Sequence, residues 1–288
     1  MYRDSETTAI CSEWEAERNK HPFVAERLDD SAVAKCWDDS AETYSGSEYA
    51  GIREEIALDL LESGILGTDR TMMDIGCGTG LYEILLHSRL KSIFCIDGSE
   101  KMIGRLRTEC INRDIRNVSS EPCMWEKFDT ADKYDIVFSS LCPPLNNPES
   151  LLRMESYSSG LCIYVSSANP VPGVSAEIWK RLKKDYSFAG YNTEFPYRYL
   201  LSIGRKPTLK FYSEEYRYGM TVPEAVSAQE RYIGKYREIT PQVREIIESA
   251  VGSESEGGMI RGKRTITLGM LVWKAGDADT QHRSAVMP

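Results

Sequence analysis

Apolar residues in the first part of the chain alternate between short continuous runs and stretches in which they recur every third or fourth residue. Continuous apolar runs are typical of strands that are buried on both faces of a parallel sheet. They occupy residues 71–75, 92–97, 134–140 and 160–167. The helically spaced stretches predict helices over residues 51–65, 81–90, 99–113 and 148–158. This alternation predicts an α/β fold with a doubly wound, Rossmann-like and mostly parallel sheet.

The pattern changes after about residue 175. Residues 208–221 and 264–274 read as strands. Helical spacing returns over residues 177–188, 222–239 and 240–251. Two late strands among helices predict an antiparallel pair at the edge of the sheet. The first 50 residues are polar and acidic, with short helical stretches at residues 9–19 and 29–44.

Composition narrows the class of protein. The 288 residues are 41% hydrophobic and 27% charged, as in ordinary globular proteins, and the net charge is −9. A chain this acidic is poorly suited to holding a nucleic-acid backbone, so we do not expect a nucleic-acid partner. The N-terminus lacks the apolar segment of a signal peptide, and no apolar run reaches the roughly 20 residues that span a bilayer. We therefore expect no membrane partner and a cytoplasmic location.

The eight cysteines are spread through the predicted core elements, and none are two or three residues apart. This distribution indicates reduced, buried thiols rather than a disulfide framework. The three histidines stand at unrelated spacings. Because zinc sites require closely spaced Cys and His ligands, we expect no metal.

Three glycines, Gly76, Gly78 and Gly80, stand where the apolar run at 71–75 meets the following helix. Glycine is needed in a strand-to-helix turn when a side chain would block a closely bound ligand. Asp97 ends the next predicted strand, 21 residues after Gly76. An acid about 20 residues beyond a glycine turn is placed to bind ribose hydroxyls. The two features together predict an adenosine-containing ligand.

The glycine spacing argues against a dinucleotide. The dinucleotide fingerprint requires a third glycine where this chain has Leu81 or Glu83, depending on the glycine from which the count starts. Asp74, at the end of the preceding strand, would also repel a pyrophosphate. A cationic ligand would not meet that repulsion.

Two segments, DIGCGTG at 74–80 and CIDGSEKMI at 95–103, resemble motifs one and two of the class I S-adenosylmethionine-dependent methyltransferases. A third, CWDDSAETY at 36–44, is similar to the helix that precedes the core in members that act on small molecules. The resemblance extends over roughly residues 36 to 170 and covers the C-terminal third only in outline. It implies S-adenosyl-L-methionine as the cofactor and methyl transfer as the reaction.

The resemblance also implies roles for individual residues. The glycine turn would contact the methionyl part of the cofactor, Asp74 would bind its ammonium group, and Asp97 would bind both ribose hydroxyls. Met102 would pack on the adenine, and Tyr44 would close over the cofactor. The residues expected to contact the cofactor are Tyr44, Asp74, Gly76, Cys77, Gly78, Gly80, Asp97, Gly98, Met102, Met124, Trp125 and Ser139. The sequence assigns no catalytic residue.

The adenine site departs from the family pattern. Family members often place an acid after the third strand to receive the adenine amino group. Met124 stands about where that acid is expected, and Trp125 follows it. Backbone groups with Met124 or Trp125 are one way to bind the adenine, and Glu126 or Asp129 is another.

The acceptor side is expected beyond the fourth strand, where the chain reads SSLCPPLNNP at 139–148. DNA and amide-nitrogen methyltransferases carry an Asn/Asp-Pro-Pro-aromatic motif here. This chain keeps the two prolines but lacks the Asn or Asp and the aromatic residue, which disfavours base methylation on DNA. Cys142 is a candidate substrate-binding thiol, with a buried apolar role as the alternative.

Residues 179–210 carry eight basic and two acidic side chains, which leaves a local charge of +6 within a −9 chain. Nine of the sixteen tyrosines lie between Tyr186 and Tyr236. In this family the region after the fifth strand often covers the acceptor. Tyr197, Arg198 and Tyr199 are therefore candidates for binding a planar or anionic acceptor. The alternative is a solvated basic helix that faces the acidic N-terminal region.

We expect one domain with additions at both ends. Residues 1–50 are interpreted as an N-terminal helical lid segment and residues 51–172 as a Rossmann-like cofactor-binding core. Residues 173–275 are interpreted as an acceptor lid with the closing edge strands, and 276–288 as a flexible tail. The favoured function is methyl transfer to a small-molecule acceptor. The alternatives are methylation of RNA or protein, and a non-methylating S-adenosylmethionine-binding protein of the same fold.

Overall fold

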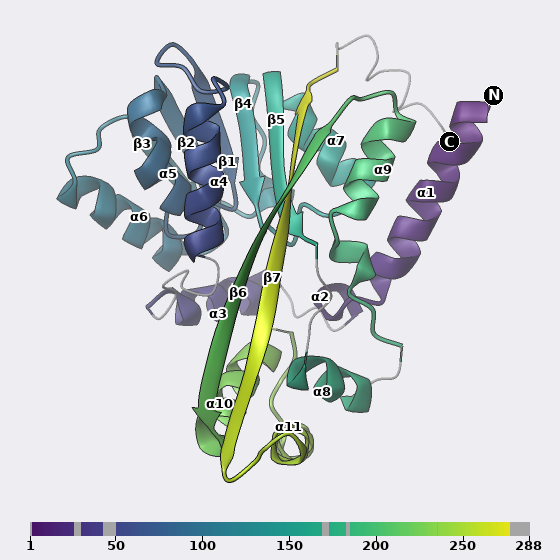
Figure 1. The fold of residues 1–288 in the computed structure, drawn as a ribbon. Coiled ribbons are helices and arrows are strands. Elements are labelled where there is room, and N and C mark those ends of the chain that lie inside the picture. Colours follow the sequence, from purple (N-terminus) through teal and green to yellow (C-terminus); the bar gives the residue numbers. More distant parts are fainter. Residues whose placement is uncertain are drawn as a thin grey trace.

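The computed structural model describes residues 2–25, 30–42, 50–168, 173–182, 185–234 and 236–276. In this part of the chain the strands form one sheet in the order β3-β2-β1-β4-β5-β7-β6 (Figure 1). The strands are β1 (Thr71–Ile75), β2 (Ser92–Asp97), β3 (Val118–Pro122), β4 (Tyr134–Ser140), β5 (Ser158–Ser167), β6 (Thr208–Thr221) and β7 (Met259–Lys274). The α-helices are α1 (Tyr2–Asn19), α2 (Pro22–Ala25), α3 (Asp30–Ala41), α4 (Ala50–Glu62), α5 (Leu81–Leu86), α6 (Glu100–Asn112), α7 (Pro148–Ser156), α8 (Val174–Leu182), α9 (Glu194–Ser202), α10 (Val222–Ile233) and α11 (Pro241–Ser253).

The first five strands run parallel, and β1 lies between β2 and β4. The strand order switches direction at β1. Strands β2 and β3 lie on one side of it, and strands β4 and β5 lie on the other. β7 then pairs antiparallel with β5, and β6 antiparallel with β7, which closes the sheet at that edge. The predicted doubly wound, mostly parallel sheet with an antiparallel edge pair is confirmed.

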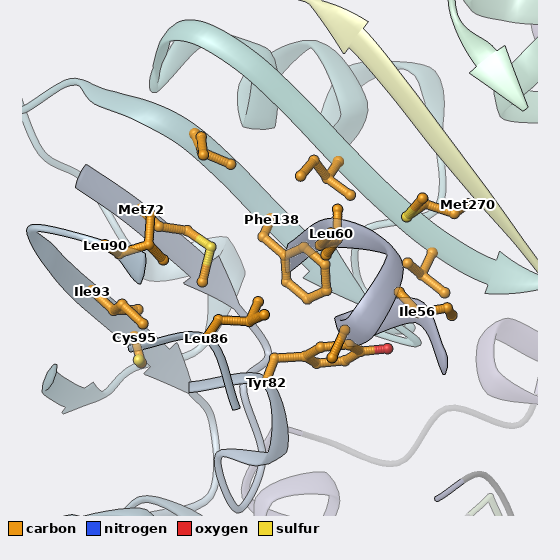
Figure 2. Packing of buried hydrophobic residues seen from close by; sticks show 14 of the residues in the cluster. Ile56, Leu60, Met72, Tyr82, Leu86, Leu90, Ile93, Cys95, Phe138 and Met270 are labelled. Carbon is orange, nitrogen blue, oxygen red and sulfur yellow. The ribbon is translucent and has the colours of Figure 1, made fainter. Parts of the chain in front are cut away.

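Helices cover both faces of the parallel strands. On one face, α4, α5 and α6 pack around Tyr82 and Phe138, whose ring centroids are 4.6 Å apart (Figure 2). On the other face, α1, α7 and α9 pack around Trp14, which is fully buried. Burial on both faces is the physical reason for the continuous apolar runs, because no strand position then faces solvent.

The two edge strands extend well beyond the parallel part of the sheet. β7 pairs with β5 only from Leu268 to Lys274, whereas it pairs with β6 from Met259 to Val272. The projecting half of this ribbon packs with α8, α10 and α11 on a third apolar cluster around Trp179 and Ile247 (Figure 1). The ribbon therefore carries a small helical extension with a core of its own.

Several helix limits differ from those expected. Helix α10 ends at Ile233, before Gly234, and not at residue 239. Helix α1 begins at Tyr2, although apolar spacing is visible only from residue 9. Helix α9 was not expected at all, because its tyrosines and Arg198 had been interpreted as acceptor-binding groups. Its buried face, which includes Phe195 and Leu200, makes it part of the core.

Some expectations concern residues that the structure does not describe. Tyr44 is one of them, and so is the expected tail apart from Gly276. The division of the chain into four segments stays a prediction. Among the helices described, none combines the length and the apolar character that crossing a bilayer requires.

Candidate cofactor and methyl-transfer site

A cavity opens at the carboxyl ends of β1, β2 and β4, where a doubly wound sheet binds its ligands. The glycine turn and the β2 end form part of its wall, and the loop after β4 forms another part. Residues of α3, α4, α5 and α6 and the segment after β3 also line it. The lining that the sequence predicted comprises Asp74, Gly76, Cys77, Gly78, Asp97, Gly98, Met102, Met124, Trp125 and Cys142.

The glycine turn is a conformational requirement. Gly76, Gly78 and Gly80 have φ values of 79°, 57° and 85°, which place all three in the left-handed region. A Cβ atom on Gly76 would lie 2.7 Å from Sγ of Cys142, and one on Gly80 would collide with Leu106. The protein itself therefore excludes side chains at two of the three positions. Gly80 caps α5 and is not part of the cavity lining, so its role is to start that helix.

The turn folds back on the end of β2. The amides of Gly76 and Cys77 both donate to the carbonyl of Ile96, at 2.8 and 3.1 Å. The amide of Gly78 donates to Oδ2 of Asp97 at 2.9 Å, and the amide of Ser99 donates to Oδ1 at 2.8 Å. Two backbone donors thus fix the Asp97 carboxylate, and its remaining lone pairs are left to accept from a ligand. Burial raises the pKa of Asp97, and the two backbone hydrogen bonds lower it.

A second acid lies behind Asp74. Asp74 is 2% exposed and Glu83, on α5, is fully buried. Burial first, and the neighbouring Glu83 carboxylate second, raise the pKa of Asp74 well above its usual range. Burial also raises the pKa of Glu83. Arg53, a cavity residue on α4, partly offsets this negative charge. No local sequence pattern marks Arg53 or Glu83 as site residues, because they lie on two separate helices, α4 and α5.

Helix α3 is fixed to the start of α6 by one carboxylate. Oδ1 of Asp38 accepts from Oγ of Ser99 at 2.5 Å and from the amide of Lys101 at 3.1 Å. Ser99 is also the N-cap of α6, since its Oγ accepts from the amide of Met102 at 3.1 Å. Through this contact α3 brings Trp37, with Val33 and Ala34, into the cavity wall.

The part of the cavity that is expected to bind the adenine is lined by methionine and tryptophan side chains. Met102, Met124 and Trp125 all reach the cavity, whereas Glu126 and Asp129 do not belong to its lining. A Cβ atom on Gly98 would collide with Sδ of Met124, so this glycine allows the methionine to lie against the β2 end. The guanidinium carbon of Arg153 lies 4.4 Å from the centroid of the Trp125 ring and holds the indole from its far side.

The loop after β4 supplies the wall expected to face the acceptor. Leu141, Cys142, Pro143 and Pro144 line the cavity there. Ser139 does not, because it is fully buried and its hydroxyl donates to the carbonyl of Ile75 at 2.8 Å. Cys142 contributes a neutral thiol, since burial raises its pKa far above the ordinary value.

The structure places Tyr197, Arg198 and Tyr199 away from this cavity. They lie on α9, which packs against α1 on the opposite face of the sheet from α4 and α5. Arg198 donates to both carboxylate oxygens of Glu13, with Nη2 and Oε2 2.8 Å apart. This corrects the expectation that the three residues line an acceptor site. Arg198 does face the acidic N-terminal region, as in the alternative, but α9 is a partly buried helix and not a solvated basic one.

Comparison with known proteins identifies one domain of the chain. Residues 72–154 match the family model described as "Methyltransferase domain". The matched segment contains both the glycine turn and Asp97, and it shows a methyltransferase domain in this part of the chain. A search of curated proteins gave no match to the methyltransferase.

Among the similar solved structures, one has a TM-score above 0.5 and shares the fold. A proposed methyltransferase from Bacillus halodurans C-125 is 11% identical, covering 77% of this chain and 99% of its own, with a TM-score of 0.51. The YcgJ protein of Bacillus subtilis is 12% identical, covering 78% and 100% of the two chains, with a TM-score of 0.48. Geranyl diphosphate C-methyltransferase of Streptomyces coelicolor A3(2), solved with S-adenosyl-L-homocysteine, is 12% identical, covering 78% and 81%, with a TM-score of 0.45. At these identities the likeness concerns the fold alone.

The cavity of the methyltransferase fits S-adenosyl-L-methionine, the cofactor of this family. Asp74 presents a buried carboxyl oxygen, Oδ1, that no N–H or O–H donor in the described residues satisfies. An ammonium group would supply such a donor. The fixed carboxylate of Asp97 has the geometry to accept from two neighbouring hydroxyls. Within the described residues, His, Cys, Asp and Glu side chains do not gather in a group of three or more that could hold a metal ion.

Proposed function

We propose that this methyltransferase methylates a small, planar and largely apolar molecule that binds between α3 and the loop from Leu141 to Pro144. The observation that carries the proposal is the wall built by α3. This helix comes from outside the sheet, is fixed to α6 through Asp38, and places Trp37 in the cavity. A cavity walled by a docked helix favours a small molecule over a polymer. The net charge of −9 also disfavours a nucleic acid.

The roles of the chain follow from its geometry. The bound cofactor supplies an electrophilic sulfonium methyl group. Asp97 and the glycine turn orient the cofactor from the sheet side. Pro143 and Pro144 stiffen the opposite wall, which holds the acceptor in line with the methyl group. The raised pKa of Cys142 makes its thiol a packing surface rather than a base. A cytoplasmic location stays a prediction.

The decisive experiment follows the methyl label. The protein is incubated with S-adenosyl-L-methionine labelled in its methyl group and with a cell extract separated into small-molecule, RNA and protein fractions. We expect label in the small-molecule fraction, and much less of it with Asp97→Ala at a subsaturating cofactor concentration. Label in RNA or protein would contradict the proposed acceptor class. Cofactor binding without transfer to any fraction would favour the non-methylating alternative.

A further inference from the structure

Asp74 and Glu83 form a buried carboxyl pair that the proposed function does not explain. Asp74 lies near the end of β1, just before the glycine turn, and Glu83 lies on the first turn of α5. Both side chains are buried and they lie within interaction range, since each shifts the pKa of the other. Each has one buried oxygen, Oδ1 of Asp74 and Oε2 of Glu83, that receives no N–H or O–H donor from the described residues. A contact between two carboxyls is favourable only when one of them carries a proton.

The surroundings do not supply enough positive charge to ionise both acids. The groups that face the pair are Arg53 from α4, Tyr82 from α5, Cys77 from the glycine turn, and Cys95 and Asp97 from β2. Arg53 is the one cation among them. Asp97 is a third carboxyl, and the thiol of Cys95 approaches Oε1 of Glu83 at 3.6 Å. One cation beside three carboxyls leaves the pair with a shared proton in the free protein.

We propose that Glu83 and Asp74 share one proton in the free methyltransferase and release it when the ammonium group of the cofactor binds Asp74. Glu83 is then a positioning residue, because it acts on the cofactor through Asp74. The ammonium group of the cofactor then supplies the positive charge next to the two carboxylates that the shared proton supplied before. The proton leaves to solvent, so that charge is conserved. The inference rests on the proposed contact between Asp74 and the ammonium group.

A pH dependence of cofactor affinity follows by linkage. If binding releases one proton, affinity rises with pH by up to about tenfold per pH unit, as long as the pair is protonated in the free protein. The rise ends at the pKa of the pair in the free protein. The measurement should stay below about pH 7.5, because an α-amino group itself loses its proton near pH 7.7 to 8.0.

The test is calorimetry in two buffers of different ionisation enthalpy at pH 7.0, which counts the protons released on binding. The probes are S-adenosyl-L-homocysteine, which carries the ammonium group, and 5′-methylthioadenosine, which lacks the amino-acid part. We expect release of about one proton with the first and close to none with the second. Both probes place a ribose on Asp97, so equal release with both would assign the proton to Asp97 and overturn the proposal. This comparison uses the unaltered protein and does not depend on a variant that folds.

Glu83→Gln provides the second arm. We expect this variant to bind S-adenosyl-L-homocysteine with little proton release, and its affinity to change less than twofold between pH 6.0 and 7.0. The matched control is Cys95→Ala, which alters the same buried contact but keeps both carboxyls, so proton release should persist. Unchanged proton release in Glu83→Gln would overturn the role of Glu83. Failure of the unaltered protein to bind either S-adenosylmethionine or S-adenosylhomocysteine would instead refute the proposed function.

Discussion

Asp97 is held in place by the amides of Gly78 and Ser99 and is therefore positioned before any ligand arrives. Asp97→Ala removes two charge-assisted hydrogen bonds to the ribose, each worth about 1.5 kcal/mol or more, and we expect at least tenfold weaker binding of S-adenosylmethionine by calorimetry.

The matched control for this prediction is Asp135→Ala. Asp135 also accepts from a backbone amide, that of Thr71 at 2.8 Å, but it does so at the opposite end of β1. This variant should lose stability and keep its cofactor affinity. Equal affinities for folded Asp97→Ala and the unaltered protein would refute the ribose assignment.

His21 should make the fold sensitive to acid. Burial, with a smaller effect from Arg18, lowers the pKa of His21 from 6.5 to about 3, and its ring stacks on Tyr191 with centroids 3.9 Å apart. The folded state therefore binds fewer protons than the unfolded state between these values. This contribution to stability is complete above pH 6.5 and is lost toward pH 3, at up to about 1.4 kcal/mol per pH unit.

Denaturant unfolding of His21→Phe and the unaltered protein, compared between pH 7 and pH 5, measures this loss. The variant keeps an aromatic ring at the position and should lose less stability on acidification. The Asp74–Glu83 pair acts in the opposite direction, because its raised pKa makes the folded state bind more protons as the pH falls. That contribution is common to both proteins and cancels in the difference. Equal pH slopes would show that His21 titrates normally in the fold.

At the scale of elements, Asp38 links α3 to the start of α6. Asp38→Ala removes the acceptor that Ser99 and the amide of Lys101 share. Loss of a capping carboxylate typically costs about 1 kcal/mol, so we expect roughly fivefold weaker cofactor binding and faster hydrogen exchange in α3. The control is Asp39→Ala, on the same helix, where the carboxylate pairs with Lys35 in solvent. If the two variants bind the cofactor equally well, α3 is not a wall that the ligand needs.

The elements also show where sequence patterns succeed. β1, β2 and β4 were predicted with the bounds they have, because burial on both faces leaves continuous apolar runs with sharp ends. The helix expected over residues 99–113 also begins at its observed N-cap, Ser99, since capping is local to the chain. The sequence pattern does not predict helix α9, because the aromatic and basic residues there are interpreted as acceptor-binding groups. The burial of α9 depends on its packing against α1, which no local pattern shows.

For the whole molecule, one buried ion pair joins the parallel core to the edge strands. Glu155 on α7 accepts from Arg205, from Nε1 of Trp273 at 2.7 Å, and from the amide of Gly276. Its side chain is 1% exposed and that of Arg205 is 11% exposed. Glu155→Ala leaves the guanidinium buried without its partner, and we expect a loss of about 3 to 5 kcal/mol in the free energy of unfolding.

An exposed pair on the same edge strands is the control for this prediction. Lys263 and Glu215 lie 2.5 Å apart across β7 and β6, with side chains 59% and 45% exposed. Glu215→Ala should change stability by no more than about 1 kcal/mol, because solvent screens such pairs. Comparable losses in the two variants would mean that Glu155 does not fasten the edge strands to the core.

The sequence by itself determined the parallel core apart from β3, together with the glycine turn and the place of Asp97. These features depend on residues that are neighbours along the chain, or on burial that leaves a periodic pattern. Only the tertiary structure decided that Glu83 meets Asp74, that Arg53 faces them, and that Asp38 fixes α3 across 61 positions of sequence. It also decided that Arg198 pairs with Glu13, 185 positions away, and not with an acceptor. Contacts between distant segments depend on how whole helices pack, and that packing leaves no local pattern in the residues that meet.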